Sequence, residues 1–398
     1  MISRKVFIIS LFICSYIYAD PVLTLVLMVK DERDVIEATL KTYCHKDVAI
    51  FVFDTGSTDG TQEKAREFFR ENNVEYATLV EEPFIDFATS RNRGLDLAEA
   101  AFPNVPFLIM PDAEWYLNDI QSLVDFCHDH LNDTSTNSYL IRILTDALDF
   151  YTARLIRNHC NIRFVGVVHE VINNMTTTKI PETIYVKYAP SQVGNEKSAR
   201  RWLRDRDLLL KSYYDNPYDP RTVFYLAQTY ACLGDWKNAC KYYQIRIQMP
   251  GWYEENFMAF YKLGEAFENR TKTEGPDMWH SALQYYLQAY AYRPQRAEPL
   301  IRIADYYLRK DCMPLCYLFA QRAAQIPYPS EDVLFVEKFM YDFTRYDILG
   351  RCSWYVNEFE AGEQALKTVL QKYKFPHLEH NLKFYVDRKR NLQIVATA

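Results

Sequence analysis

The chain has 398 residues, enough for two or three domains that each bury a hydrophobic core. Hydrophobic residues make up 49% of it and aromatic residues 15%, which excludes an intrinsically disordered protein. The net charge is −6 without a block of like charges, and this argues against nucleic acid or an anionic membrane surface as the main partner, because both bind basic surfaces.

Residues 1–19 have the pattern of a secretory signal peptide. Arg4 and Lys5 precede the hydrophobic run 6–18, which is short for a membrane span, and Ala19 stands at a suitable cleavage position. An ordinary hydrophobic N-terminus is the alternative. We therefore expect an exported or secretory-pathway protein if 1–19 is a signal peptide, a cytoplasmic one if it is not, and no stable membrane span.

Residues 20–195 alternate short β-rich runs with helical patterns. The pattern predicts strands at 22–28, 50–53 and 107–110, and helices at 35–43, 61–71 and 90–100. This order predicts an α/β domain with a mostly parallel sheet covered by helices on both faces. Because ligands of such sheets bind beyond the carboxyl ends of the strands, we expect the chemistry in the residues that follow each strand.

The second expected strand leads into Asp54 and the turn 55–60, which is rich in glycine, serine and threonine. A carboxylate at a strand end, followed by such a turn, suits nucleotide binding, because Asp54 can accept hydrogen bonds from a base or ribose. The alternative for Asp54 and Asp59 is that they only cap the turn. We favour the nucleotide role for Asp54, and both roles stay open for Asp59.

The third expected strand is followed by Asp112 and Glu114. On an extended backbone, residues two apart point to the same side, so the two carboxylates can converge. Two hard oxygen ligands suit Mg²⁺ or Mn²⁺ bridging a diphosphate, and such a metal offsets the charge on a departing nucleoside diphosphate. A solvated turn is the alternative for an acid-x-acid triplet.

Two further groups of polar residues can reach the same edge of the sheet. Arg91 or Arg93 can pair with phosphate oxygens, with a structural ion pair to Asp86 as the alternative. A later apolar run ends in His169 and Glu170. His169 can be a third metal ligand and Glu170 a general base near an acceptor hydroxyl, whereas the alternative for a lone histidine is a structural role.

From residue 196 onward, helical periodicity replaces the strand pattern. We expect a linker helix at 196–215, a helical repeat domain at 216–375 and a C-terminal tail at 376–398. Successive copies of the repeat are marked by Leu226, Leu263 and Ile303, offsets of 37 and 40 residues. These offsets are slightly longer than the 34-residue tetratricopeptide period, with an insertion around 271–276 in the second copy. An irregular helical bundle is the alternative.

Short motifs in the expected order extend over nearly the whole chain after residue 19. In the first half they are 29–32, 54–61, Phe87 with Arg91-Asn92, and 112–115. Further motifs are 154–158, 166–170, 224–230, 251–255 and 296–300. The first set resembles family-2 glycosyltransferases of the GT-A fold, and the second is similar to a subgroup with C-terminal tetratricopeptide repeats.

The resemblance implies inverting transfer of a sugar from a nucleotide-sugar, often a uridine diphosphate sugar, with Mg²⁺ or Mn²⁺. The expected donor-binding residues are Glu32, Asp54, Asp86, Arg91, Asn92 and Asp112, the expected metal ligands are Asp112, Glu114 and His169, and the expected catalytic base is Glu170. The repeats are expected to bind a protein or glycan acceptor, or a partner. No nucleic-acid partner is expected.

The acidic motif departs from the family pattern, which is usually Asp-Ala-Asp-Glu before the tryptophan. Alignment on Glu114-Trp115 puts Pro111 and Ala113 at the acidic positions, which damages the metal pair. The alternative function is therefore a catalytically inactive relative that binds through both domains. A nucleotidyltransferase is a third hypothesis, but it would require a glycine-rich phosphate loop with a lysine near the N-terminus, and residues 29–34 contain no such loop.

Overall fold

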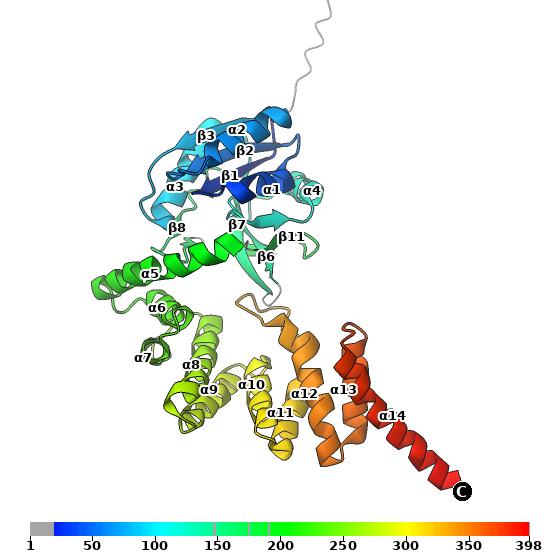
Figure 1. Ribbon diagram of the computed structural model, residues 1–398. Helices are drawn as coiled ribbons and strands as arrows, with labels where there is room; N and C mark the ends of the chain where they lie inside the picture. The colour runs from blue at the N-terminus through cyan, green and yellow to red at the C-terminus, as the bar shows by residue number, and fades with distance from the viewer. Residues whose placement is uncertain (1–19, 146–148, 174–175, 190–191, 398) are drawn as a thin grey trace, which may run out of the picture.

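The computed structural model describes residues 20–145, 149–173, 176–189 and 192–397. Figure 1 shows an α/β domain, coloured blue to teal, and below it an arch of helices, coloured green to red. The long helix α5 (Gln192–Asp215) runs between them. This confirms the predicted α/β domain followed by helical repeats. The predicted signal peptide, residues 1–19, lies outside the described residues.

The α/β domain contains the three predicted strands and three predicted helices together with further elements. They are β1 (Leu23–Val29), α1 (Arg33–Tyr43), β2 (Val48–Asp54), α2 (Thr61–Glu71), β3 (Ala77–Glu81), α3 (Phe87–Ala101), β4 (Phe107–Ile109), β5 (Trp115–Leu117), α4 (Ile120–Asp129), β6 (Ser138–Leu144), β7 (Asp149–Arg157), β8 (Phe164–Val165), β9 (Val171–Ile172), β10 (Thr177–Lys179) and β11 (Tyr185–Tyr188). The chain alternates strand and helix up to β4 and is richer in strands after α4.

The main sheet has the strand order β3-β2-β1-β4-β7-β6-β11-β5, and β10 pairs with β6. Strands β3, β2, β1 and β4 are parallel, whereas β7 is antiparallel to both β4 and β6. Helices α1 and α2 bury Ile36 and Phe68 against one face of the parallel half, and α3 buries Leu95 against the other. Coverage on both faces explains why β1 and β2 are continuous hydrophobic runs. Their carboxyl ends point to a single edge.

The helical part begins at α5 and reaches the C-terminus. After α5 it comprises α6 (Pro220–Cys232), α7 (Trp236–Arg246), α8 (Tyr253–Glu274), α9 (Met278–Tyr292), α10 (Glu298–Arg309), α11 (Met313–Gln325), the π-helical turn η1 (Met340–Thr344), α12 (Arg345–Cys352), the 3-10 turn η2 (Ser353–Val356), α13 (Phe359–Leu370) and α14 (Pro376–Thr397). The three predicted copies are the pairs α6–α7, α8–α9 and α10–α11. No helix in the described part of the chain has both the length and the hydrophobicity that crossing a membrane requires.

Two boundaries differ from the predicted ones. The predicted linker helix, 196–215, begins four residues earlier, at Gln192. The predicted tail, 376–398, is helix α14 as far as Thr397, because Leu378 and Tyr385 are buried against the preceding helices. The Tyr385 hydroxyl also donates a hydrogen bond of 2.8 Å to the Gly350 carbonyl. Because α14 has many charged residues and few buried ones, its sequence shows no clear helical periodicity.

Gly264 in α8 shows why the repeats need small residues at fixed positions. A Cβ atom added there would lie 2.6 Å from Cδ1 of the fully buried Tyr286 in α9. We expect Gly264→Ala to lower the free energy of unfolding by about 1–3 kcal/mol, because the ring cannot move aside without disturbing its packed surroundings. Urea denaturation measures the change. In a Tyr286→Leu background the same substitution should cost less, and an equal cost in both backgrounds would contradict this explanation.

The helical domain contacts the α/β domain a second time through the loop 326–339, between α11 and η1. In Figure 1 this loop reaches the lower end of β6 and β7. Asp149 at the start of β7 exchanges two backbone hydrogen bonds with Val336, of 3.1 and 3.2 Å, and its carboxylate accepts from the Tyr328 hydroxyl at 2.9 Å. The arch therefore contacts the α/β domain a second time after its three predicted helix pairs, and α12 to α14 continue beyond this contact.

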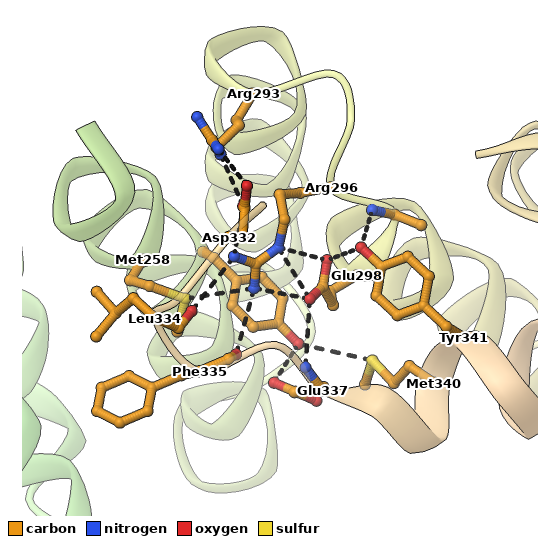
Figure 2. A network of polar contacts seen from close by, with 12 residues as sticks. Met258, Arg293, Arg296, Glu298, Asp332, Leu334, Phe335, Glu337, Met340 and Tyr341 are labelled. Carbon is orange, nitrogen blue, oxygen red and sulfur yellow. Dashed lines mark hydrogen bonds and ion pairs between the residues drawn. The ribbon is translucent and has the colours of Figure 1, made fainter. Parts of the chain in front are cut away.

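A buried ionic network holds the loop 326–339 in place (Figure 2). Arg296 is fully buried and donates hydrogen bonds to Glu298 and Asp332, at 2.7 and 3.1 Å, and to the carbonyls of Leu334 and Phe335. Burial alone would lower the pKa of Arg296, but Glu298 raises it above its ordinary value. The motif at 296–300 therefore contributes to a structural anchor within the helical domain.

Candidate active site

Asp54 ends strand β2 and is fully buried. Its Oδ1 accepts hydrogen bonds from the amides of Gly56 and Ser57, at 2.9 and 2.8 Å. Its Oδ2 is buried and has no hydrogen-bond partner among the described residues. One oxygen therefore caps the turn, as the structural alternative expected, while the other is left for a ligand. An unsatisfied buried acceptor is costly, so a bound donor group there would be favourable.

Asp59 lies in the same loop, between β2 and α2, and has a structural role. Its carboxylate accepts hydrogen bonds from the amides of Thr61 and Arg33, at 3.0 and 3.1 Å. These bonds fix the start of α2 against the start of α1. Of the two aspartates in this loop, only Asp54 keeps an oxygen without a partner.

Arg91 is the centre of the site. It lies in α3 with only 5% of its side chain exposed, and its guanidinium donates hydrogen bonds to Asp112, which follows β4, and to Glu170. Arg154 on β7 lies on the other side of Glu170, at 3.5 Å. The Asp112 side chain is 44% exposed, whereas that of Glu170 is 6% exposed. Two guanidinium groups and two carboxylates thus meet at one place, and Asp112 is the member that faces solvent.

The charges of this group determine its protonation. Burial would raise the pKa of Glu170 and of Asp112, but Arg91 and Arg154 lower both below their ordinary values. Burial and the charge of Arg91 lower the pKa of Arg154. Both carboxylates are therefore ionised at neutral pH. The Nε of Arg154 is buried without a hydrogen-bond partner among the described residues.

Two predicted donor-binding residues serve structural roles in this geometry. Asp86 caps α3, and its two carboxylate oxygens accept hydrogen bonds from the amide and the hydroxyl of Thr89, at 2.7 and 2.8 Å. Asn92 exchanges two hydrogen bonds with the backbone of Phe164 on β8, at 2.7 and 2.9 Å. The proposed Asp86–arginine ion pair is absent, since Arg93 pairs with Glu82 instead.

Glu32 and Glu114 lie near one another at the ends of β1 and β4. Burial raises the pKa of Tyr116, and the carboxylates of Glu114 and Glu32 raise it further, which places both charges close to that ring. Burial likewise raises the pKa of Tyr188, and Glu114, Asp112 and Glu32 add to that shift. Arg201 opposes that shift, and three of the predicted acidic residues therefore act electrostatically on one ring.

The predicted metal site is not assembled as expected. The backbone between Asp112 and Glu114 is a turn, with φ of 64° at Glu114 and a hydrogen bond from the Trp115 amide to the Asp112 carbonyl. The extended geometry that would align the two carboxylates is therefore absent. Among the described residues, no three His, Cys, Asp or Glu side chains form a possible metal site. The predicted trio of Asp112, Glu114 and His169 does not fit a three-ligand site.

His169 faces the helical domain. Its ring stacks on Tyr225 of α6, with centroids 4.1 Å apart and planes 17° apart. Its backbone has φ of 52°, a left-handed conformation that costs about 1–3 kcal/mol in a residue other than glycine. The structure thus directs the His169 ring to Tyr225 and brings its neighbour, Glu170, to Arg91 and Arg154.

Three residues of this region were not predicted as site residues. Arg154 could have been noticed as a charged residue within the buried strand β7. Arg221 carries no sequence signal, and Tyr225 belongs to the motif 224–230 without any sign of a contact to His169, because both contacts join positions more than fifty residues apart.

One family model matches part of the chain. Residues 24–150 match the family model described as glycosyl transferase family 2. This part of the chain is a family-2 glycosyltransferase domain. The match begins in β1 and ends in β7, so it includes Asp54, Arg91 and Asp112 but not Glu170. No curated protein sequence matches the chain.

Solved structures similar to parts of the chain fall into two groups. A mannosyltransferase from Pyrobaculum calidifontis, in complex with GDP-mannose and Mn²⁺, is 16% identical over 67% of this chain and 86% of that one, with a TM-score of 0.37. MamA is 13% identical over 51% of this chain and 99% of that one, with a TM-score of 0.33. A tetratricopeptide repeat-containing protein from Cytophaga hutchinsonii is 15% identical over 44% of this chain, with a TM-score of 0.34, and the chain covers 60% of its length. The family assignment depends on residues 24–150 alone.

The glycosyltransferase domain thus has groups suited to two tasks at one sheet edge. The Oδ2 of Asp54 is a buried acceptor for a donor hydroxyl or amide. Asp112 and Arg91 present a carboxylate and a guanidinium side by side, and a guanidinium can pair with phosphate oxygens. Glu170, held on the far side of Arg91, is an ionised carboxylate beside that position.

Proposed function

We propose that the protein transfers a sugar, with inversion, from a uridine diphosphate sugar to a protein or glycan acceptor. The observation that carries the proposal is the family match of residues 24–150, which contain the buried Asp54 and the Arg91–Asp112 pair. The helical repeats would bind the acceptor or a partner, since such arrays present extended surfaces.

The proposed donor site is built from Asp54 Oδ2, which has no hydrogen-bond partner in the described part of the chain, and from the ion pair of Arg91 and Asp112. The nucleoside of the donor would lie against the end of β2, where Asp54 Oδ2 accepts a hydrogen bond from it. Its diphosphate would lie beside Arg91, whose guanidinium can pair with phosphate oxygens. Glu32 would line the same pocket from the end of β1. Asp86 and Asn92 would contribute by fixing α3 and β8 rather than by touching the donor.

A divalent cation would fit this site if one protein carboxylate held it together with the phosphate oxygens of the donor. Magnesium is commonly held by one or two carboxylates together with the phosphate oxygens of the substrate, so a full set of protein ligands is not required. Asp112, with its side chain 44% exposed, is the residue that would hold Mn²⁺ or Mg²⁺. When bound, such an ion offsets negative charge on the diphosphate.

The transfer step needs one carboxylate near the acceptor hydroxyl, and Glu170 is our candidate. The acceptor oxygen forms a bond to the anomeric carbon while the bond from that carbon to the phosphate oxygen breaks. The electron pair of the broken bond leaves with uridine diphosphate, and the acceptor proton passes to the Glu170 carboxylate. Arg91 and Arg154 keep Glu170 ionised before the step and orient it.

Calorimetric titration of uridine diphosphate tests the donor site. We expect Mn²⁺ to tighten binding to wild type by at least about tenfold, and Asp112→Asn to remove that gain, because one carboxylate bridges ion and protein. Asp86→Asn is the matched control. It should bind like wild type, since asparagine also caps a helix and neither carboxylate oxygen is free for the donor.

The catalytically inactive alternative makes a different prediction. If wild type binds no nucleoside diphosphate with or without Mn²⁺, the transferase proposal fails and the chain is a binding protein. If wild type binds uridine diphosphate and releases it from a uridine diphosphate sugar, the alternative fails. Glu170→Gln should then bind the nucleotide normally and lose turnover.

A further inference from the structure

The segment 166–170, which ends in Glu170, is held mainly by the helical domain. Val168 is buried in the hydrophobic cluster of that domain, together with Val223 and Phe224 of α6. The next residue, His169, stacks on Tyr225 of the same helix. A segment that carries a proposed catalytic group is therefore packed against the repeats.

A hydrogen bond adds a second constraint. Arg221, in the first turn of α6, donates from Nη2 to the His169 carbonyl at 2.9 Å and to the Tyr225 hydroxyl at 3.3 Å. Asp219 caps this helix end by accepting from the Arg221 and Thr222 amides. Asp219, Arg221 and Tyr225 are thus held to one another by contacts within α6 and its N-cap, independently of segment 166–170.

The Arg221 side chain also forms an ion pair with the next repeat. Its Nη1 lies 3.6 Å from Glu255 Oε2, in α8. Glu255 Oε1 in turn accepts two hydrogen bonds from the fully buried Arg246 of α7, at 2.8 and 2.9 Å. A chain of charged contacts therefore runs from the second repeat to the His169 carbonyl.

The backbone of segment 166–170 needs such support. Both Gly166 and His169 have positive φ, of 105° and 52°. The left-handed conformation suits glycine but is strained for histidine, and it persists only where the surroundings impose it. The two contacts from α6 lie at this strained residue, next to Glu170, which reaches back to Arg91 and Arg154.

We propose that Arg221 and Tyr225, in the first helix of the repeats, are positioning residues that hold the turn at His169 so that Glu170 meets Arg91. The inference rests on the proposed function for the role of Glu170. The repeats then have a part in the transfer step itself, besides any binding of acceptor. Neither residue touches the donor, and both act through segment 166–170.

Hydrogen–deuterium exchange of the full chain tests the positioning directly. Tyr225→Leu removes the stacked ring and Arg221→Gln removes the charged donor. Both should speed exchange of the amides of segment 166–170 by at least about tenfold, while the core of the sheet exchanges as in wild type. Tyr225→Phe keeps the stacked ring and loses only the hydrogen bond from Arg221, so it should speed exchange far less than Tyr225→Leu. Tyr218→Leu, at a position 84% exposed just before α6, is the matched surface control.

Release of uridine diphosphate from the sugar nucleotide that wild type turns over fastest gives the second readout. Tyr225→Leu and Arg221→Gln should lower kcat by about 100-fold with KM for the donor within about twofold, because a displaced catalytic group costs rate and not donor affinity. Tyr218→Leu should keep the wild-type kcat, and Tyr225→Phe, which keeps the stacked ring, should lower kcat far less than Tyr225→Leu. A merely structural defect would instead affect both constants and the whole exchange pattern.

The outcomes separate the inference from the proposed function. Unchanged exchange of segment 166–170 in both Tyr225→Leu and Arg221→Gln overturns the inference, whatever the activity. If wild type turns over no sugar nucleotide, the proposed function fails, yet the exchange measurement still decides whether α6 holds the segment. If Tyr225→Leu unfolds, Arg221→Gln decides alone, because its side chain is partly exposed at a helix end.

Discussion

Arg91→Met is expected to lower the free energy of unfolding of the glycosyltransferase domain by about 3–5 kcal/mol and to abolish turnover. Removing one partner of a buried ion pair leaves charge undercompensated: Glu170 would keep only Arg154, at 3.5 Å, and Asp112 would lose its hydrogen-bonded guanidinium. Methionine keeps much of the side-chain volume, so the loss reflects charge and not a cavity. Urea denaturation and uridine diphosphate release measure the two effects.

Arg93→Met is the matched control, two residues along the same helix. Arg93 also pairs with a carboxylate, Glu82, but its side chain is 50% exposed, so little change in stability and none in turnover is expected. Equal losses in the two variants would contradict the buried-pair explanation.

Arg91→Met should also change the dependence of the free energy of unfolding on pH. In wild type the folded-state pKa of Glu170 and of Asp112 is below its ordinary value, because Arg91 and Arg154 face both carboxylates. Their contribution is therefore present above the unfolded pKa values, near 4, and is lost as pH falls through the lower folded values. The stability difference between wild type and Arg91→Met should shrink below about pH 4. A difference that stays constant between pH 7 and pH 3 would contradict this account.

Arg296→Met is expected to destabilise the helical domain by about 3–5 kcal/mol, because Glu298 would stay buried without its cation and Asp332 would keep only Arg293. The loop 326–339 would lose the hydrogen bonds from Arg296 to its Leu334 and Phe335 carbonyls. Urea denaturation gives the stability, and hydrogen exchange at the amides of Asp149 and Tyr151, which pair with this loop, reports its detachment.

Arg309→Met is the comparison variant in the same domain. Arg309 pairs with Asp305 and Glu268, but its side chain is 51% exposed, so the expected change is under about 1 kcal/mol. An Arg296→Met variant as stable as Arg309→Met, with Asp149 and Tyr151 still protected, would show that the network does not hold the loop.

Much of the architecture could be predicted because it depends on local patterns. The run 22–28 forms β1 and 50–53 lies within β2, since a strand covered on both faces needs continuous hydrophobic residues. The spacing of Leu226, Leu263 and Ile303 matches three helix pairs, because each repeat buries the same small and aromatic positions against its neighbour. Strand-end positions likewise placed Asp54 and Asp112 at one edge of the sheet.

The candidate site was only partly predictable, because neighbouring residues do not determine which side chains meet. Arg91 and Glu170 are 79 positions apart, and sequence patterns left open whether Arg91 would pair with Asp86 or with phosphate. Asp86 is satisfied locally by Thr89, so it caps α3. The turn at Glu114 was hidden too, since Asp-x-Glu after a strand is compatible with both extended and turned backbone.

The sequence by itself therefore determined the two-domain architecture, the strands β1, β2 and β4, the repeat period and the acidic residues at the strand ends, because each depends on periodic burial or on a residue type at a strand end. Only the tertiary structure decided that Glu170, not His169, joins Asp112 through Arg91, and that α6 supports the segment between the domains. These contacts form because a buried charge must find its counter-charge wherever the fold brings one. The charged residues lie far apart along one domain, and the contacts from α6 to His169 cross the domain boundary, so no local sequence pattern predicts either set.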